Sequence, residues 1–137
     1  MKHLNMWVDA PEIWIPTEIW NKNKVETEDY NALFIEKATE FGCYAGLDLS
    51  TTTDLTALIY VTEPDLQGNR YIMPYFFCPF DTIDRRSKED RVPYRYWKDQ
   101  NYIIATPGNV VDYSEIKNTI LKYQQLYNVK NIEVDKW

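Results

Sequence analysis

The sequence predicts an α/β protein built around a mixed β-sheet, and three observations lead to that prediction. Two apolar runs of strand length, residues 43–47 and 55–61, are joined by a short polar turn, as in a β-hairpin. A third run at 70–78 follows a turn rich in Pro, Gly and Asn, which extends the hairpin to an antiparallel three-strand meander. Ile132 and Val134 then alternate as a fourth strand after a helix, and a helical crossover allows that strand to lie parallel to the first.

Three helices are predicted around these strands. A proline can open a short helix over 17–23, and apolar residues at helical spacing predict a second helix over 28–41 that Gly42 ends. Asp112 caps a longer helix with an apolar stripe, and Asn128 can end it in the left-handed conformation.

The predicted helices and strands in the middle of the chain are shorter and more often interrupted. Pro74 cannot donate to a ladder, so the third strand is predicted to be an edge or to be bulged there. Residues 81–100 predict short helical pieces interrupted at Pro93, and 102–105 predict a brief extended segment.

Length and composition predict one modest domain preceded by an arm. A chain of 137 residues with 45% hydrophobic content is small for two cores. Residues 1–27 carry Trp7, Trp14 and Trp20 among Pro, Asn and Lys, which indicates a linker whose tryptophans pack on a neighbouring domain or on this domain's flank. The domain itself is placed at residues 28–137.

The sequence also predicts a soluble, intracellular protein without a membrane partner. No apolar run approaches the roughly 18 to 20 residues that span a bilayer, and the N-terminus lacks the apolar stretch of a signal peptide. Cys43 and Cys78 lie in predicted strands among apolar neighbours and form no CxxC pair, so both are expected to be reduced core residues.

Asp48 is the first candidate functional residue. It is a single carboxylate in an otherwise apolar strand, and period-two alternation places it on the face opposite Leu47 and Leu49. A carboxylate within a strand core costs several kcal/mol unless it is paired, hydrogen-bonded or bound to a cation, so compensation is expected. Hydrogen bonds from the following hydroxyl-rich turn and a metal role both remain open at this point.

Asp135 is the second candidate. It follows the predicted fourth strand, so it meets Asp48 at one edge of the sheet if the two strands are neighbours. Convergent carboxylates suit Mg²⁺ or Mn²⁺, and two such ions about 4 Å apart can activate water and stabilise the leaving oxygen in phosphodiester cleavage. The alternative is a terminal aspartate in solvent.

A basic segment with interleaved aromatic residues suggests nucleic-acid contacts. The formal net charge is -6, which argues against binding by the chain as a whole. Residues 85–98, however, include six basic and two acidic residues, which gives this segment a formal charge of +4. Tyr and Trp residues are interleaved with the basic ones. A solvated helical face is the alternative. The candidate contacts are Arg85, Arg86, Lys88, Arg91, Arg95 and Lys98.

An ordered set of short motifs spans nearly the whole chain and resembles the large terminase subunit of tailed bacteriophages. The motifs are Lys2–Asn5, Cys43–Ser50, Asp54–Ala57, Arg85–Lys88 with Val92–Tyr94, Thr106–Tyr113 and Asp135–Trp137. The resemblance covers the linker after that family's ATPase domain and the first part of its nuclease domain. It implies a ribonuclease H-like fold that cuts concatemeric DNA with a divalent metal. By the same resemblance Asp48 is the first metal carboxylate and Asp135 is the second.

The chain also departs from that family. It contains no GxxxxGK[ST] phosphate loop, so the ATPase domain is missing and ATP hydrolysis is not expected. The family's third metal carboxylate lies in a segment that this chain does not reach, so the Mg²⁺ or Mn²⁺ site is expected to be incomplete, the sheet truncated and the chain a fragment. The resemblance implies double-stranded DNA, the portal and the small terminase subunit as partners, and the cytoplasm of the bacterial host as the location.

Two other classes of protein remain open. An Asp before a Ser/Thr-rich turn also resembles the phosphate-binding hairpin of sugar kinases and actin, although residues 49–53 lack the glycine that such a hairpin usually carries. A non-catalytic assembly module is the second alternative, in which the Trp-rich arm and the basic segment dock on partner proteins.

Overall fold

A computed structural model of the protein describes residues 14–50 and 54–135. The chain divides into two units, residues 1–30 and residues 31–137, and the second holds the sheet. In chain order the elements are α1 (Thr17–Asn21), α2 (Tyr30–Phe41), β1 (Cys43–Asp48), β2 (Thr56–Thr62), β3 (Ile72–Pro79), η1 (Phe80–Thr82), α3 (Ile83–Glu89), α4 (Tyr94–Asp99), β4 (Ile104–Thr106), α5 (Tyr113–Leu126) and β5 (Val129–Val134).

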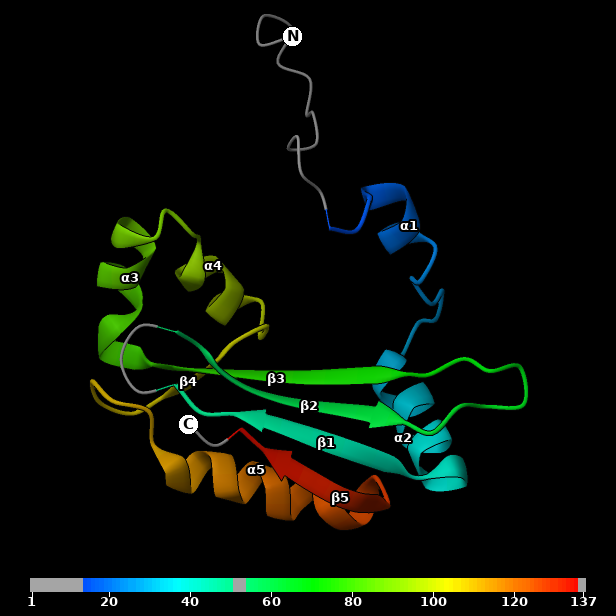
Figure 1. Cartoon of the computed structure of the whole chain (residues 1–137). Coiled ribbons are helices and arrows are strands. Elements are labelled where there is room, and N and C mark those ends of the chain that lie inside the picture. The colour runs from blue at the N-terminus through cyan, green and yellow to red at the C-terminus, as the bar shows by residue number, and fades with distance from the viewer. Residues whose placement is uncertain (1–13, 51–53, 136–137) are drawn as a thin grey trace, which may run out of the picture. The chain divides into compact units, whose positions relative to one another are not determined.

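The sheet has five strands in the order β4-β3-β2-β1-β5 (Figure 1). β1 pairs antiparallel with β2, and β2 pairs antiparallel with β3, which confirms the predicted meander. β5 lies parallel to β1, as predicted for the last strand, across a ladder that has one register shift. The extended segment predicted at 102–105 forms the short strand β4, which runs parallel to β3.

Pro74 lies in β3 opposite Ile59 of β2, in a continuous register. β4 pairs with β3 only from Phe77 to Pro79, so the side of β3 away from β2 has no partner strand at Pro74 among the described residues. The missing N–H therefore falls on a free edge, which is the first of the two predicted outcomes.

One face of the sheet forms the main core. Strand alternation places Cys43, Ala45 and Leu47 on this face, and all three are buried. The pairing with β2 adds Leu58 and Tyr60, which are fully buried. α5 runs along this face (Figure 1).

α2 and α5 meet in an aromatic cluster on this face. Phe34 of α2 meets the ring of Tyr127, just after α5, edge to face at 4.9 Å, and Tyr60 of β2 meets the same ring at 5.1 Å. Such pairs add about 0.5–1.5 kcal/mol beyond the area they bury. The cluster joins α2, β2 and the end of α5 through one buried tyrosine.

The opposite face is covered only in part. α3 and α4 lie on it near β3 and β4 (Figure 1), where Cys78, Ile83 and Ile103 form a second buried cluster. Tyr44, Gly46 and Asp48 point to this face from β1 and are exposed. The candidate carboxylate therefore stands on the less covered side of the sheet.

The helix boundaries follow their predicted signals. α2 ends at Phe41, and Gly42 adopts φ +81° directly after it. Asp112 caps α5 by accepting a hydrogen bond from the Ser114 amide at 2.8 Å, and Asn128 has φ +49° just past its end. No helix in the described ranges is long and apolar enough to cross a membrane.

The first unit contains α1, preceded by Pro16 as predicted. Trp14 is 93% exposed and Trp20 is 65% exposed, so their apolar surfaces face solvent. Trp7 lies outside the described residues. The sequence boundary between residues 27 and 28 stays a prediction.

Replacing Gly42 with alanine should destabilise the protein more than the same change at Gly68. Both glycines have a left-handed φ, +81° and +86°, which costs an alanine about 1–2 kcal/mol. A Cβ at Gly42 would also lie 2.5 Å from Cε of Lys130, the end of a flexible side chain that can move aside by giving up its exposed ion pair with Glu63, whereas a Cβ at Gly68 meets nothing within 4 Å; the expected difference is therefore small, about 1 kcal/mol or less. Urea unfolding of both variants measures the difference, and equal losses would contradict the steric argument.

The Cys43 thiol should make stability fall with rising pH. Cys43 is buried and donates to the Tyr127 carbonyl at 3.1 Å, and burial raises the pKa of the thiol from 9.0 to about 11. Below pH 9 the thiol is neutral in both states. Between about pH 9 and 11 the unfolded chain ionises first, so the contribution is lost at up to about 1.4 kcal/mol per pH unit.

Comparison with Cys43→Ala isolates this contribution, because several buried tyrosines also titrate at high pH. The stability advantage of the wild type over the variant should shrink across that window, as measured by urea unfolding at several pH values. A constant difference would show that the thiol has the same pKa in the folded and unfolded states.

Candidate metal site

The two predicted carboxylates lie at the ends of neighbouring parallel strands. Asp48 is the last residue of β1, and Asp135 directly follows β5, whose tip lies beside that of β1 (Figure 1). The register pairs Leu47 with Val134, and the Asp135 amide donates to the Leu47 carbonyl at 3.0 Å. Because residues next to a paired position point to the opposite face, the parallel alignment directs both carboxylates to the same side of the sheet.

Both carboxylates line one shallow hollow of about 410 Å³. Its walls are mainly apolar and come from β1, β2 and β5. The lining residues are Gly46, Leu47, Asp48, Ala57, Ile59, Glu133, Val134 and Asp135. The structure thus brings together the two residues singled out in the sequence, while their function as ligands remains a prediction.

Asp48 is exposed, and the expectation that burial destabilises its charged carboxylate is wrong. The expectation assumed that both faces of β1 are covered, whereas α3 and α4 lie only over the β3 and β4 side. A carboxylate in contact with water needs no compensating partner. Its exposure leaves it accessible to a cation.

The alternative that the turn after β1 satisfies Asp48 stays a prediction, because residues 51–53 of that turn lie outside the described ranges. Ser50 is buried, and its amide donates to Oγ1 of Thr56 at 3.0 Å, while the two hydroxyl oxygens also lie 3.0 Å apart. No hydrogen bond or ion pair to the Asp48 carboxylate is found within residues 14–50 and 54–135. The turn is held together by Ser50 and Thr56, and residues 51–53 lie outside the described ranges.

Glu133 is a third carboxylate in this hollow that sequence analysis missed. It pairs with Gly46 in the parallel ladder, and its Oε1 accepts a hydrogen bond from Nδ2 of Asn131 at 2.5 Å. The signal was present in the alternation of β5, which places Glu133 two residues before Asp135 on the same face.

The donor set fits part of a divalent-metal site. Mg²⁺ is commonly bound through one or two carboxylates and keeps several waters, and Asp48 and Asp135 supply such oxygen ligands on an accessible surface. In the described residues no group of three His, Cys, Asp or Glu side chains is placed to hold one ion together. The described residues therefore supply two carboxylates but no complete protein cage.

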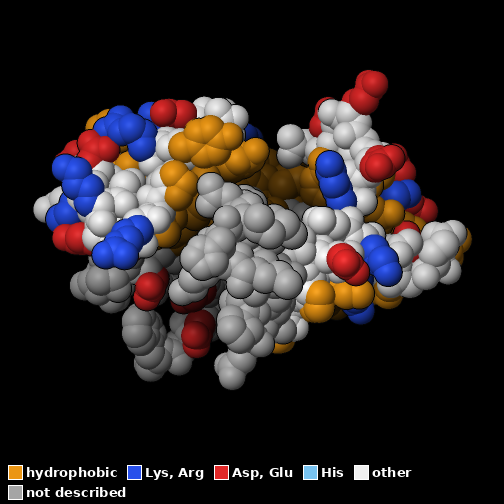
Figure 2. Space-filling view, turned by 90° about the horizontal axis from the view of Figure 1, so that it is seen from above, with side chains coloured by type: hydrophobic (Ala, Val, Ile, Leu, Met, Phe, Trp, Pro, Cys, Tyr) orange, Lys and Arg blue, Asp and Glu red, His pale blue; other side chains and the backbone are white. Residues whose placement is uncertain are grey.

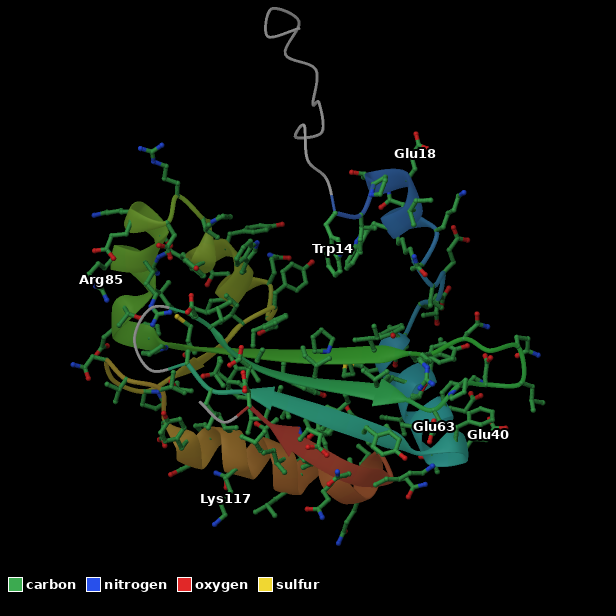
Figure 3. All side chains as sticks on the ribbon, viewed as in Figure 1. Trp14, Glu18, Glu40, Glu63, Arg85 and Lys117 are labelled. Atoms are coloured by element: carbon green, nitrogen blue, oxygen red, sulfur yellow. The ribbon has the colours of Figure 1, made fainter. Side chains whose placement is uncertain are left out.

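Of the six predicted nucleic-acid contacts, five reach the surface and one is buried. Arg85, Lys88, Arg91 and Arg95 are exposed on or beside α3 and α4, and Arg85 points outward (Figure 3). Lys98 is half-buried, with Nζ 5.8 Å from the centre of the Phe80 ring. Arg86 differs from the others because it is only 4% exposed.

Acidic neighbours reduce the charge of this basic segment. Nη2 of Arg95 lies 2.5 Å from the Asp84 carboxylate. Hydrogen bonding by Arg95 also holds the pKa of the Asp84 carboxyl below its usual value. Arg85 pairs with Glu89 at 2.7 Å and Lys98 with Asp99 at 3.0 Å. Acidic and basic side chains are interspersed over this part of the surface in Figure 2. The charge of +4 was counted over residues 85–98, which excludes Asp84 and Asp99 on either side, so the count overstated the positive charge.

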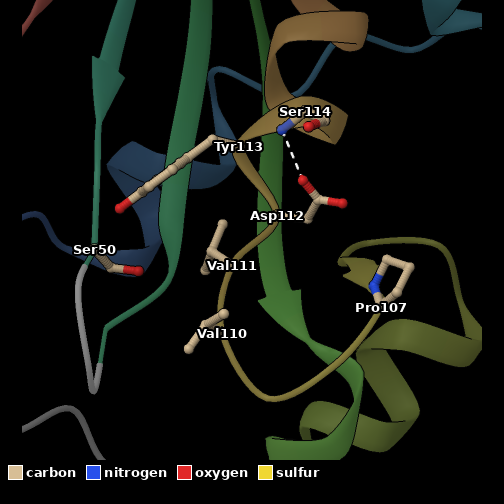
Figure 4. A pocket seen from close by; sticks show the side chains of 7 residues that line it. All are labelled: Ser50, Pro107, Val110, Val111, Asp112, Tyr113 and Ser114. Atoms are coloured by element: carbon tan, nitrogen blue, oxygen red, sulfur yellow. Dashed lines mark hydrogen bonds between the residues drawn. The ribbon is translucent and has the colours of Figure 1, made fainter.

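A second, larger hollow of about 610 Å³ lies at the start of α5 (Figure 4). It is lined by Ser50, Pro107, Val110, Val111, Asp112, Tyr113 and Ser114. Its one carboxylate, Asp112, already serves as the helix cap. The smaller hollow holds the predicted carboxylates, and we place the candidate site there.

An antiparallel meander followed by a helix and a strand parallel to the first, with carboxylates at the tips of that strand pair, defines a ribonuclease H-like α/β protein. The family model for the terminase large subunit, endonuclease domain, matches residues 1–137. The chain therefore belongs to the terminase large subunit endonuclease-domain family, which is the family its motifs resemble.

One curated relative is a large terminase subunit of Enterobacteria phage HK97, which is 38% identical over 94 residues. The match covers 69% of this chain and 18% of the relative. The crystal structure of the HK97 large terminase matches with a TM-score of 0.63 at 38% identity, over 69% of this chain and 20% of that one. The chain thus spans about a fifth of the length of these relatives.

Proposed function

We propose that this chain supplies part of a metal-dependent endonuclease that hydrolyses phosphodiester bonds of concatemeric DNA during phage packaging. The observation that carries the proposal is the position of Asp48 and Asp135, at neighbouring strand tips in one hollow, in a member of the terminase endonuclease family. A nucleotide-binding hairpin of the sugar-kinase type has no comparable support, because the family match points elsewhere.

Asp48 and Asp135 would hold Mg²⁺ or Mn²⁺ through carboxylate oxygens. When bound, such an ion lowers the pKa of a coordinated water and stabilises charge on the phosphodiester. The residues themselves contribute by orientation, because strand pairing between β1 and β5 fixes the spacing of the two backbones that carry them. A ligand from outside the described residues would complete the site.

The same proposal names the partners. Exposed cations such as Lys88 and Arg91, which form no ion pair within 4 Å in the described ranges, would contact the DNA backbone. The portal, the small terminase subunit and a location in the host cytoplasm follow from the role in packaging. The proposed activity does not require ATP hydrolysis by this chain.

Nicking of supercoiled plasmid by the whole chain tests the activity. We expect relaxed plasmid to accumulate in Mn²⁺ or Mg²⁺ and none to form with EDTA. Titration of Mn²⁺ followed by electron paramagnetic resonance measures metal binding independently of cleavage. Binding without cleavage would indicate an incomplete site, and the absence of both would overturn the proposal.

The exposure of Trp14 and Trp20 favours a second candidate function, that of a non-catalytic assembly module. In that case replacing either tryptophan with alanine would weaken packaging in a reconstituted system, while substituting the two aspartates would leave packaging and cleavage unchanged. The opposite pattern would support the nuclease.

A further inference from the structure

Gly46 differs from the other glycines of the chain in its backbone conformation. The sequence has four glycines, and Gly42, Gly68 and Gly108 adopt φ between +81° and +86°, a region that favours glycine over residues with a side chain. Gly46 is not among the glycines with positive φ, and it lies within the regular strand β1. The conformation of its backbone therefore does not require a glycine.

Packing within the described residues does not require a glycine at position 46 either. Gly46 is exposed, and a Cβ built on it meets no atom within 4 Å. It pairs with Ile59 of β2 and Glu133 of β5, and the one register shift of the parallel ladder lies earlier, between Cys43 and Tyr44. A glycine within a strand lowers stability relative to alanine, because it loses more backbone freedom on folding and adds no side chain to pack. The described part of the fold gives no reason for this loss.

Gly46 leaves a gap beside the first candidate metal ligand. Strand alternation places Tyr44 and Asp48 on the same face as Gly46, each about 7 Å from it along β1. Gly46 lines the hollow that holds the two candidate aspartates, and its strand partners Ile59 and Glu133 line the hollow on either side. The floor of the hollow next to Asp48 is therefore bare backbone.

The gap suits an uncharged part of the DNA backbone. A phosphodiester held by a metal ion at Asp48 carries a deoxyribose on each of its two ester oxygens, so a sugar must lie close to that carboxylate. The mainly apolar lining, which includes Ile59, can contact the carbon atoms of a sugar, whereas Glu133 would repel a second phosphate. A glycine within a strand is also typical of a place where a ligand approaches the backbone closely.

We propose that Gly46 is a substrate-contacting residue, and that the deoxyribose next to the scissile phosphate lies over its bare backbone. This inference rests on the proposed nuclease function and adds which part of the DNA enters the hollow. A side chain at position 46 would lift the sugar from the sheet and move the phosphate away from an ion at Asp48. Binding of the ion itself would not change, because its carboxylate ligands are kept.

Three variants of the whole chain test this proposal. Gly46→Ala adds one carbon above the floor of the hollow, and Gly46→Val adds three. Val61→Ile is the matched control, because it adds one carbon on the same face of the sheet, opposite Tyr44 and outside the hollow. Urea unfolding measures stability, and electron paramagnetic resonance measures Mn²⁺ binding. Plasmid nicking gives kcat/KM, and fluorescence anisotropy of a labelled DNA duplex in EDTA measures DNA binding without metal.

We expect Gly46→Ala to unfold at a higher urea concentration than wild type and to keep the Kd for Mn²⁺ within about twofold. Its kcat/KM for nicking should fall about tenfold, the lower end of the effect of one methylene in a binding pocket. Its Kd for the duplex in EDTA should rise, and Gly46→Val should show larger losses in both measurements. Val61→Ile should match wild type in nicking and in duplex binding.

A lower urea midpoint for Gly46→Ala would overturn the proposal, because the glycine would then serve the fold. A raised Kd for Mn²⁺ would overturn it by showing that position 46 acts on the ion. Wild-type nicking and duplex binding in both Gly46 variants, or a wild type that binds no duplex, would show that no sugar lies over Gly46. If the wild type neither binds Mn²⁺ nor nicks, the proposed function fails, while the duplex Kd values in EDTA still decide whether DNA contacts Gly46.

Discussion

Substitution of Asp48 by asparagine should abolish metal-dependent nicking without destabilising the protein. The variant keeps the shape of the side chain but removes the charge that a hard cation requires. Losses of about 100-fold or more are expected if the carboxylate holds the ion that activates the nucleophile. Stability should change by less than about 0.5 kcal/mol, because the Asp48 side chain is exposed and its carboxylate makes no hydrogen bond or ion pair in the described ranges.

Asp135→Asn should have the same effect, because Asp135 lies in the same hollow and is also exposed. Glu133→Gln is the matched control. It removes one negative charge from the same hollow, but Glu133 is not placed to complete a three-ligand group with the two aspartates in the described ranges. We expect it to nick at close to the wild-type rate. Cleavage that survives both aspartate substitutions would refute the site, and equal losses in all three variants would indicate a general electrostatic effect.

Sequence analysis predicted the strands and the helix caps, because each depends on local chemistry, and it predicted the parallel pairing of the last strand from the helical crossover before it. Gly42 and Asn128 occur where a helix must end with positive φ, and Asp112 occurs where amides need an acceptor. The meeting of Asp48 and Asp135 also followed, since a helical crossover permits parallel pairing and thereby places two strand tips together.

Properties that depend on packing between distant segments could not be predicted in the same way. Nothing local to Asp48 reveals which face of the sheet α3 and α4 leave uncovered. Nothing local to Arg86 distinguishes it from Arg85, because burial of one guanidinium depends on the Asp54 carbonyl, 32 residues away. The charge of the basic segment was overestimated because Asp84 pairs with Arg95 across two helices.

Replacing Phe34 with alanine should produce the largest loss of stability among the changes considered. Phe34 is fully buried and is, with Ala38, one of the two buried residues of α2. Removal of a buried phenylalanine costs about 3–5 kcal/mol, since a cavity remains where the ring was. The edge-to-face contact with Tyr127 is lost as well, and Tyr127 itself bonds Tyr75 through hydroxyl groups 2.6 Å apart.

A loss of this size is a large share of the about 5–15 kcal/mol that stabilises a typical domain, so the variant should melt at a much lower temperature. Glu36→Ala on the same helix is the control, because Glu36 is exposed and its one ion pair among the described residues is with Lys37. It should change stability by less than about 0.5 kcal/mol. The comparison also tests the predicted domain boundary at residue 28, because a helix that is part of the folding unit transmits the loss of Phe34 to the whole sheet. If circular dichroism instead shows the sheet melting at the wild-type temperature, α2 is an appendage and the domain begins after it.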